Sequence, residues 1–247
     1  MTKAPSKARR RATEVRLEIE PKVTLPSESV AVIADLEGFT NYHNDAGSLS
    51  TLPHYLSYVF RALTVMFNGG ELFWIEGNTP PITPLEVCPK HVKYLGDGAL
   101  YLFRCTSFSD DFPSRLMDRL YYLSRNFELL NNWMSKKHGH SKKYPSHIRF
   151  GVARGHTYKL ARKNPKMDEY HGVPINLASR LQSFCSRLGV IAASNIGNID
   201  SNDQFRLSEA KNVRSFGNEY VYVPSDELDA LDTSIRTTKF TDFVLKN

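Results

Sequence analysis

The sequence lacks the features that mark membrane-embedded and secreted proteins. No run among its 247 residues approaches 18 consecutive apolar residues, which argues against a membrane-spanning helix. The first segment, MTKAPSKARRRATEVR, has no apolar core and does not resemble a secretory signal. Cysteines are few, and the spacing of Cys88, Cys105 and Cys185 fits neither a disulfide scaffold nor a zinc module. We therefore expect a cytoplasmic protein with reduced thiols.

Acidic residues are missing from one long stretch, although the net charge of the whole chain is only +6. Residues 129–167 carry ten Lys/Arg and no Asp/Glu, whereas residues 1–22 carry seven Lys/Arg and three Glu. The rest of the chain therefore has a net charge of −8. Few aromatic residues interrupt the basic stretch, so it makes a poor base-stacking surface. We expect no nucleic-acid partner, and a nucleic-acid binder using residues 129–167 is the alternative.

Apolar periodicity divides the chain into a basic, proline-containing arm over residues 1–27 and one domain over residues 28–247. Helical spacing is predicted from Thr51 to the Gly69-Gly70 pair, over residues 116–134 and over residues 172–188. Apolar runs and alternation predict strands at 29–35, 71–76, 91–95, 99–103, 147–155, 190–194, 213–216 and 219–223. This order predicts an α/β protein, more closely an α+β sandwich with a ferredoxin-like βαββαβ core and additional strands.

Two aspartates occupy positions suited to a metal site. Asp35 ends the apolar run SVAVIAD, and Asp97 lies in the Gly-Asp-Gly turn between two predicted strands. If those strands are neighbours in one sheet, the carboxylates converge. Hard divalent cations prefer such oxygen ligands and share them with substrate phosphates. The alternative is that Asp97 is only a turn residue, because Gly-Asp-Gly favours turns in any case.

Two further segments carry groups suited to phosphate and ribose. The segment Glu37-Gly38-Phe39-Thr40 joins a strand to a helical region, where backbone N–H groups can hold phosphate oxygens, although no Walker A pattern is present. Asn176 and Arg180 are four residues apart on a predicted helix and share a face. An Asn beside an Arg suits a ribose and a phosphoryl group. A solvated polar face is the simpler alternative for this pair.

Taken together, four motifs resemble the catalytic domain of the class III nucleotidyl cyclases. They are ADLEGFT (34–40), KYLGDGALYLF (93–103), IRFGVARG (148–155) and HGVPINLASRLQS (171–183), and they occur in the family's order. The resemblance covers roughly residues 29–223. It implies the cyclase fold and a reaction in which the ribose 3′-oxygen of a nucleoside triphosphate attacks its own α-phosphorus. Pyrophosphate leaves, and a 3′,5′-cyclic nucleotide forms.

The resemblance also implies cofactors and their ligands. Two Mg²⁺ or Mn²⁺ ions would be bound by Asp35, Asp97 and the carbonyl of Leu36. The backbone amides of Phe39 and Thr40 would hold the β- and γ-phosphates. In this family one ion activates the 3′-hydroxyl and the other binds the triphosphate.

Other roles implied by the resemblance fall on the second half of the chain. Asn176 would orient the ribose, and Arg180 would stabilise charge on the α-phosphate. Arg214, with Lys211 as second choice, would neutralise the terminal phosphates. In this family the metal aspartates and the Asn/Arg helix of one site come from different protomers. A homodimer with two shared sites is therefore implied.

The base-reading positions leave the substrate open. Lys93 stands where adenylyl cyclases carry a purine-reading lysine, and Glu169 stands where they carry Asp, which leans towards adenine. However, the added segment at residues 71–90, close to the base pocket, and the absence of any sensory module resemble the pyrimidine cyclases of bacterial antiphage (Pycsar) systems. Those enzymes make cyclic UMP or cyclic CMP for a separate effector. We favour UTP, then CTP. The alternatives are an adenylate cyclase making cyclic AMP and a catalytically silent nucleotide-binding domain.

Overall fold

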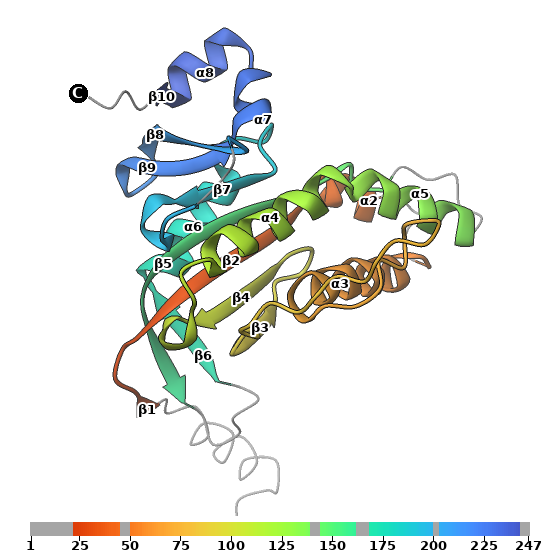
Figure 1. Ribbon diagram of the computed structural model, residues 1–247, viewed down its shortest axis with the longest axis horizontal. Helices are drawn as coiled ribbons and strands as arrows, with labels where there is room; N and C mark the ends of the chain where they lie inside the picture. The colour runs from red at the N-terminus through yellow and green to blue at the C-terminus, as the bar shows by residue number, and fades with distance from the viewer. Residues whose placement is uncertain (1–21, 45–49, 139–143, 162–167, 200–202, 243–247) are drawn as a thin grey trace, which may run out of the picture.

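The computed structural model describes residues 22–44, 50–138, 144–161, 168–199 and 203–242 (Figure 1). Most of the predicted arm, residues 1–21, lies outside the described residues. The end of the arm pairs with the domain, because β1 (Lys22–Val23) runs antiparallel to the far end of β5. In the described part of the chain, no helix has both the length and the apolar character needed to cross a membrane.

One large mixed sheet forms the centre of the molecule. Its strand order is β10-β8-β9-β7-β5-β2-β4-β3, and β1 and β6 also pair with β5. All pairings are antiparallel except that of β5 with β7. The other strands are β2 (Ser27–Glu37), β3 (His91–Tyr94), β4 (Ala99–Arg104), β5 (His147–Ala161), β6 (Glu169–Gly172), β7 (Val190–Ala193), β8 (Phe205–Val213), β9 (Gly217–Pro224) and β10 (Phe240–Asp242).

Helices cover both faces of this sheet. The helices are α2 (Phe39–Asn44), α3 (Leu52–Asn68), α4 (Phe112–Arg125), α5 (Phe127–His138), α6 (Val173–Phe184), α7 (Ser225–Asp229) and α8 (Thr233–Lys239). Side chains alternate along β2, so that Val30 and Val32 join the core cluster under α3, α4 and α5, whereas Ala31 and Ile33 join the cluster under α6. The predicted α+β class with added strands is confirmed.

Glycine allows α6 to lie directly on the sheet. A Cβ at Gly151 of β5 would overlap the carbonyl oxygen of Ala178 in α6. Because backbone meets backbone there, no side chain larger than hydrogen fits without moving the helix. The IRFGVARG motif is therefore a packing motif as well as a strand, and it fixes where the α6 residues stand relative to β2.

The helix predicted over residues 116–134 is wrong in one respect, because it is two helices. Its apolar seam is real, and Leu116, Leu120 and Leu130 are all buried in the core. The break falls at Asn126, whose side-chain amide donates to the Tyr122 carbonyl at 2.8 Å. Asparagine competes with the helical backbone for such bonds and thereby ends α4.

The strand predicted at residues 71–76 is also wrong. Leu72 and Trp74 are buried, but this segment forms turns and no ladder. Its aromatic rings bury themselves against helices instead, and Phe73 packs edge-on against Trp133 of α5 with ring centroids 5.2 Å apart. Aromatic burial, rather than strand pairing, explains the apolar run.

Two strand predictions need new boundaries. The strand predicted at residues 147–155 does not end at Gly155 but continues as β5 to Ala161, where it pairs with β1 and β6. The late hairpin is formed by β8 and β9, so the predicted strand 213–216 is largely the turn between them. Ser215 adopts a positive φ of 70° in that turn, a conformation that ends a strand.

Candidate active site

Asp35 and Asp97 stand on neighbouring strands. β2 and β4 pair antiparallel with Ala34 opposite Ala99, so Asp35 lies beside the turn that carries Asp97. The fit is close, because a Cβ at Gly98 would overlap the carbonyl oxygen of Ala34. Burial raises the pKa of Asp97, and the negative charge of Asp35 adds to that rise. The strand pairing assumed from the sequence is therefore present, and the negative charge of Asp35 affects the pKa of Asp97.

Two residues that sequence reasoning did not single out hold Asp35. Arg149 lies directly opposite it on β5 and donates to Oδ2 at 2.9 Å. Gln182 of α6 donates to the same oxygen, also at 2.9 Å, from a side chain that is buried. The sequence signal for Arg149 was its position in the strand predicted at residues 147–155, and its meaning depends on the register of β2 with β5.

These residues suit divalent cations. Within the described residues no group of three or more His, Cys, Asp and Glu side chains gathers as a metal site. A cation at Asp35 and Asp97 would therefore need further oxygens from backbone, water or substrate, as Mg²⁺ sites commonly do. Burial, and secondarily the charge of Asp35, raises the pKa of Asp97, and a bound cation would favour the ionised form of this carboxyl.

The residues at the start of α2 follow a strand-to-helix turn. Gly38 has a φ of +82°, which turns the chain out of β2, and Phe39 and Thr40 open the helix. Leu36, whose carbonyl was predicted as a metal ligand, is a buried residue of β2. This arrangement places the backbone amides of Phe39 and Thr40 in the first turn of α2, four and five residues after Asp35. The N–H groups of a first helical turn lack intrahelical partners.

Asn176 and Arg180 lie on α6, one turn apart. Asn176 is exposed and Arg180 is half-buried, whereas Leu177 and Leu181 pack inward. Among the described residues, no hydrogen bond or ion pair joins either side chain to Asp35 or Asp97. The α6 side chain that reaches Asp35 within one chain is Gln182 instead. The predicted Asn/Arg pair and the predicted metal pair are thus separate groups in the single chain.

Lys93 and Glu169 form an ion pair. The Nζ of Lys93 on β3 lies 2.5 Å from Oε2 of Glu169 on β6, and both side chains are partly exposed. Next to them, His91 and Tyr170 pack with ring centroids 4.6 Å apart, and burial lowers the pKa of His91. The two residues predicted to read a base therefore come together, from strands distant in sequence.

The late basic residues differ from one another in their surroundings. The Nζ of Lys211 donates a hydrogen bond to the Thr237 carbonyl at 2.8 Å, which holds this side chain against the C-terminal part of the domain. Arg214 lies in the β8–β9 turn and is exposed. Of the two, Arg214 has the side chain that is available to a ligand, in line with its rank in the sequence-based assignment.

The added segment does not lie beside the predicted base pocket, and that expectation is wrong for residues 71–87. Arg119 of α4 donates to the Thr83 carbonyl at 3.2 Å, and the Leu85 amide donates to the Phe67 carbonyl of α3 at 3.0 Å. These contacts place the segment over α3 and α4. Side chains alternate along a strand, and Tyr94, the neighbour of Lys93, packs on Phe60 of α3. The Lys93 side chain therefore points to the face of β3 that is opposite to α3.

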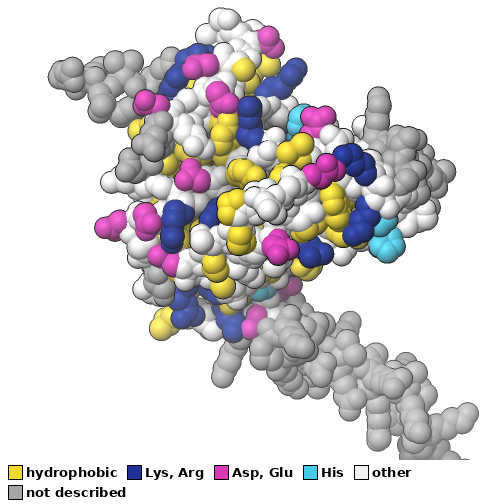
Figure 2. Space-filling view, turned by 45° about the vertical axis from the view of Figure 1, so that its right-hand side comes forward, with side chains coloured by type: hydrophobic (Ala, Val, Ile, Leu, Met, Phe, Trp, Pro, Cys, Tyr) yellow, Lys and Arg dark blue, Asp and Glu magenta, His cyan; other side chains and the backbone are white. Residues whose placement is uncertain are grey.

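The basic stretch of residues 129–167 is largely neutralised within the chain where it is described. Lys136, Arg149, Arg154 and Lys159 pair with Glu76, Asp35, Glu28 and Asp168, respectively. On the face shown in Figure 2, Lys and Arg side chains are interspersed with Asp and Glu rather than gathered in one basic surface. Five of the ten basic residues of this stretch lie outside the described residues. The described ones act mainly as structural counter-ions.

Comparison with known proteins shows which solved structures share the fold of this chain. No family model and no curated protein matches the sequence. Among solved structures, the adenylyl cyclase CyaB from P. aeruginosa superposes with a TM-score of 0.58 at 16% identity, over 82% of this chain and 95% of that one. The guanylyl cyclase Cya2 gives 0.53 at 14% identity, over 83% and 93%. Adenylate cyclases from Trypanosoma brucei give 0.53 at 14%, over 83% and 92%.

The chain therefore has the fold of the class III adenylyl and guanylyl cyclase catalytic domains. At these identities the likeness concerns the fold. The chemistry has to be argued from the residues that the fold brings together.

Proposed function

We propose that this protein is a nucleotidyl cyclase that converts a nucleoside triphosphate to a 3′,5′-cyclic nucleotide and pyrophosphate. The observation that carries the proposal is the pairing of β2 with β4, which sets Asp35 and Asp97 side by side. α6 presents Asn176 and Arg180 on one face of the same fold. Two carboxylates, an amide and a guanidinium are the groups that this reaction needs.

Each residue has a defined task in this reaction. Asp35, Asp97 and the Leu36 carbonyl would hold two Mg²⁺ or Mn²⁺ ions, and these ions would lower the pKa of the 3′-hydroxyl and offset triphosphate charge. Asn176 orients the ribose so that its 3′-oxygen faces the α-phosphorus. A bond forms between that oxygen and the phosphorus, the bond to the β-phosphate oxygen breaks, and the hydroxyl proton leaves to solvent.

The remaining residues of the site bind the phosphates and offset their negative charge. Arg180 donates to the α-phosphate oxygens, where negative charge concentrates during the displacement. The Phe39 and Thr40 amides at the start of α2 and the exposed Arg214 hold the leaving pyrophosphate. These groups donate hydrogen bonds and need not change protonation state.

The proposed enzyme is a homodimer with two shared sites. In the described part of one chain, no hydrogen bond or ion pair joins Asn176 or Arg180 to Asp35 or Asp97. The resemblance to class III cyclases supports a second copy that brings the two groups together. A twofold-symmetric pair completes two equivalent sites at once. A monomer is accordingly expected to have little activity.

The proposed substrate is UTP, followed by CTP. The Lys93–Glu169 ion pair offers one donor and one acceptor side by side, which match the O4 acceptor and the N3–H donor of uracil. Because Glu is one methylene longer than Asp and reaches Lys93 directly, it narrows the space for a base and favours the smaller pyrimidine. By resemblance to the Pycsar cyclases, the product would signal to a separate effector in antiphage defence.

Cyclic AMP formation is the second candidate. Adenine also presents an acceptor (N1) beside a donor (N6–H₂), so the same ion pair can read it. The two candidates differ in the ring that fits between Lys93 and Glu169, not in the phosphate chemistry.

The identity of the product separates these candidates. Purified protein is incubated with equimolar ATP, GTP, CTP and UTP and Mn²⁺, and products are identified by mass spectrometry. We expect cyclic UMP to exceed the other cyclic nucleotides, with cyclic CMP second. Cyclic AMP as the main product would select the adenylate cyclase alternative. Absence of every cyclic nucleotide from a confirmed dimer would leave a catalytically silent nucleotide-binding domain.

Shortening the acidic partner is expected to widen the base pocket. Glu169→Asp removes one methylene, so the carboxylate withdraws from Lys93 and a purine gains room. We expect the ratio of cyclic AMP to cyclic UMP to rise about tenfold in the same mixture. Glu219→Asp, in β9, is the matched control and should leave the ratio unchanged. An unchanged ratio in Glu169→Asp would contradict the role of Glu169 in choosing the base.

A further inference from the structure

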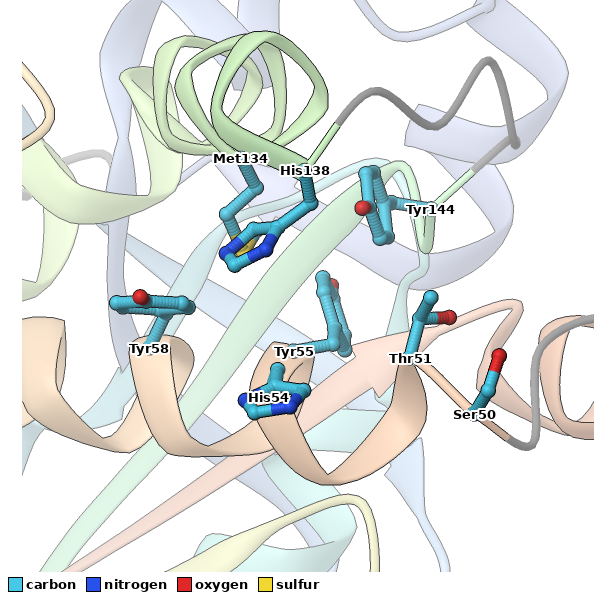
Figure 3. Close-up of a pocket in the computed structure, with 8 residues that line it drawn as sticks. All are labelled: Ser50, Thr51, His54, Tyr55, Tyr58, Met134, His138 and Tyr144. Atoms are coloured by element: carbon cyan, nitrogen blue, oxygen red, sulfur yellow. The ribbon is translucent and has the colours of Figure 1, made fainter.

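A cavity lined by none of the residues assigned to the candidate active site lies between α3 and α5 (Figure 3). Its volume is about 280 Å³, and its described lining consists of Ser50, Thr51, His54, Tyr55, Tyr58, Met134, His138 and Tyr144. Figure 3 shows α3 side chains forming one wall, while Met134 and His138 hang from α5 on the other side, beside Tyr144. None of these residues belongs to the proposed cyclase site.

The walls of this cavity are mostly aromatic ring faces. Tyr55 and Tyr144 stack with centroids 4.9 Å apart and an angle of 8° between the rings. His54 and His138 stack at 5.8 Å and 20°, and Tyr58 approaches His138 at 5.5 Å. Such faces favour contact with another flat ring. Because the two imidazoles stack face to face, they do not converge on one point as two ligands of a single metal ion would.

Two buried polar atoms of the lining have no hydrogen-bond partner among the described residues. They are the hydroxyl of Tyr55, a residue only 1% exposed, and Nε2 of His138. The neighbouring Tyr42 shows that the region is able to satisfy a hydroxyl, because its own hydroxyl pairs with Thr51 at 2.9 Å. Buried polar groups are nearly always paired in folded proteins, so two orphans at one cavity indicate a missing partner.

The described lining favours a partner that carries no charge and can hydrogen-bond in two directions. Among the described lining residues there is no Asp, Glu, Lys or Arg to balance an ion. Burial raises the pKa of Tyr55 well above its ordinary value, so its hydroxyl stays protonated and can both donate and accept. Water alone is a poor filling, because a cavity of this size holds several molecules and offers them mainly carbon surface.

We propose that this cavity is a binding site for a planar, uncharged heteroaromatic ring of the nucleobase class. The ring lies against the Tyr55, Tyr144 and His138 rings, and its polar edge pairs with the Tyr55 hydroxyl and with Nε2 of His138. This site is separate from the Lys93–Glu169 pair and does not depend on cyclase activity.

Binding of free bases tests the proposal. Free uracil and free adenine, which lack ribose and phosphate, are titrated into the full-length chain by isothermal calorimetry without divalent metal. We expect saturable binding of at least one base to wild type. Tyr55→Phe keeps the ring and removes the hydroxyl, and is expected to weaken binding about five- to tenfold. His138→Phe, which keeps a ring and removes the nitrogens, is expected to weaken it similarly.

Controls separate this cavity from the active site and from misfolding. Tyr101→Phe removes another buried tyrosine hydroxyl that lies outside the cavity and should leave affinity unchanged. Lys93→Ala disables the proposed base reader, so any binding that persists in this variant belongs to the cavity, and the effect of Tyr55→Phe is measured in that background. Tyr55→Phe removes an unpaired buried hydroxyl, so its thermal midpoint should not fall. The proposal is overturned if neither base binds, if both cavity variants bind as wild type does, or if Lys93→Ala abolishes binding.

Discussion

Asp97→Asn is expected to lower cyclic nucleotide formation by at least about 100-fold while the protein stays folded. The substitution keeps the size of the side chain and removes the negative charge that a divalent cation needs. Initial rates with saturating Mn²⁺ and each triphosphate give the measurement. Asp110→Asn, an exposed position in the loop before α4, is the matched control and should keep wild-type activity. Activity of Asp97→Asn above about a tenth of wild type would contradict the metal role.

Stability distinguishes loss of chemistry from loss of structure in this experiment. The pKa of Asp97 is raised in the folded chain, mainly by burial, so its charged form is disfavoured there. A raised carboxyl pKa means that the charge costs stability above the folded pKa and costs nothing below the unfolded pKa. At neutral pH, Asp97→Asn should therefore unfold at the same temperature as wild type or a higher one.

Asp35 is a less suitable position for the same test. Its carboxylate accepts bonds from Arg149 and Gln182, and the Arg149 side chain is only 15% exposed. Removing the carboxylate leaves a mostly buried guanidinium without its counter-ion, which destabilises proteins by several kcal/mol in comparable cases, about 3–5 kcal/mol. Loss of activity in Asp35→Ala would thus mix a folding defect with a catalytic one.

The contrast between the two aspartates shows where sequence reasoning ends. The apolar run ending in Asp35 and the Gly-Asp-Gly turn around Asp97 are local patterns, and they predicted both strands. The pairing of those strands was only a condition for the carboxylates to converge. The Arg149–Asp35 ion pair depends on the register of β5 against β2. A slip of this register by one residue would move every side chain of the strand to the other face of the sheet. No local pattern reports that register.

Errors in the predicted elements have the same origin. Residues 71–76 have a strand-like composition, yet their rings are buried against helices that lie far along the chain. Asn126 divides the predicted helix although the apolar seam continues past it, because its side-chain amide donates to the Tyr122 carbonyl. Apolar periodicity does not report such a bond. The charge count of residues 129–167 left a nucleic-acid binder as the alternative, whereas the described lysines and arginines mostly pair with carboxylates from other segments.

The meeting of Lys93 with Glu169 required both kinds of information. The motifs marked the two positions by resemblance, and only the fold brings β3 and β6 close enough for a contact of 2.5 Å. The direct ion pair also replaces the added segment as the argument for a pyrimidine base, since residues 71–87 lie over α3 and α4.

Mixing two inactive variants is expected to restore activity if the sites are shared between copies. In a heterodimer of Asp97→Ala and Arg180→Ala chains, one site has both defects and the other has none. Random pairing makes half of the dimers mixed, and each mixed dimer has one whole site of two. The mixture should therefore reach about a quarter of wild-type activity, whereas each variant alone stays near zero.

The decisive comparison is between variants on different groups and variants on the same group. Asn176→Ala and Arg180→Ala both alter α6, so their heterodimer has one defect in each site and should recover nothing. Tandem purification with two affinity tags isolates the mixed dimers before assay. Within the described residues of one chain, no hydrogen bond or ion pair joins the Asn176 and Arg180 side chains to Asp35 or Asp97. In the proposed dimer, only exchange between copies can therefore rescue activity. Isolated Asp97→Ala/Arg180→Ala heterodimers without activity would refute the shared site.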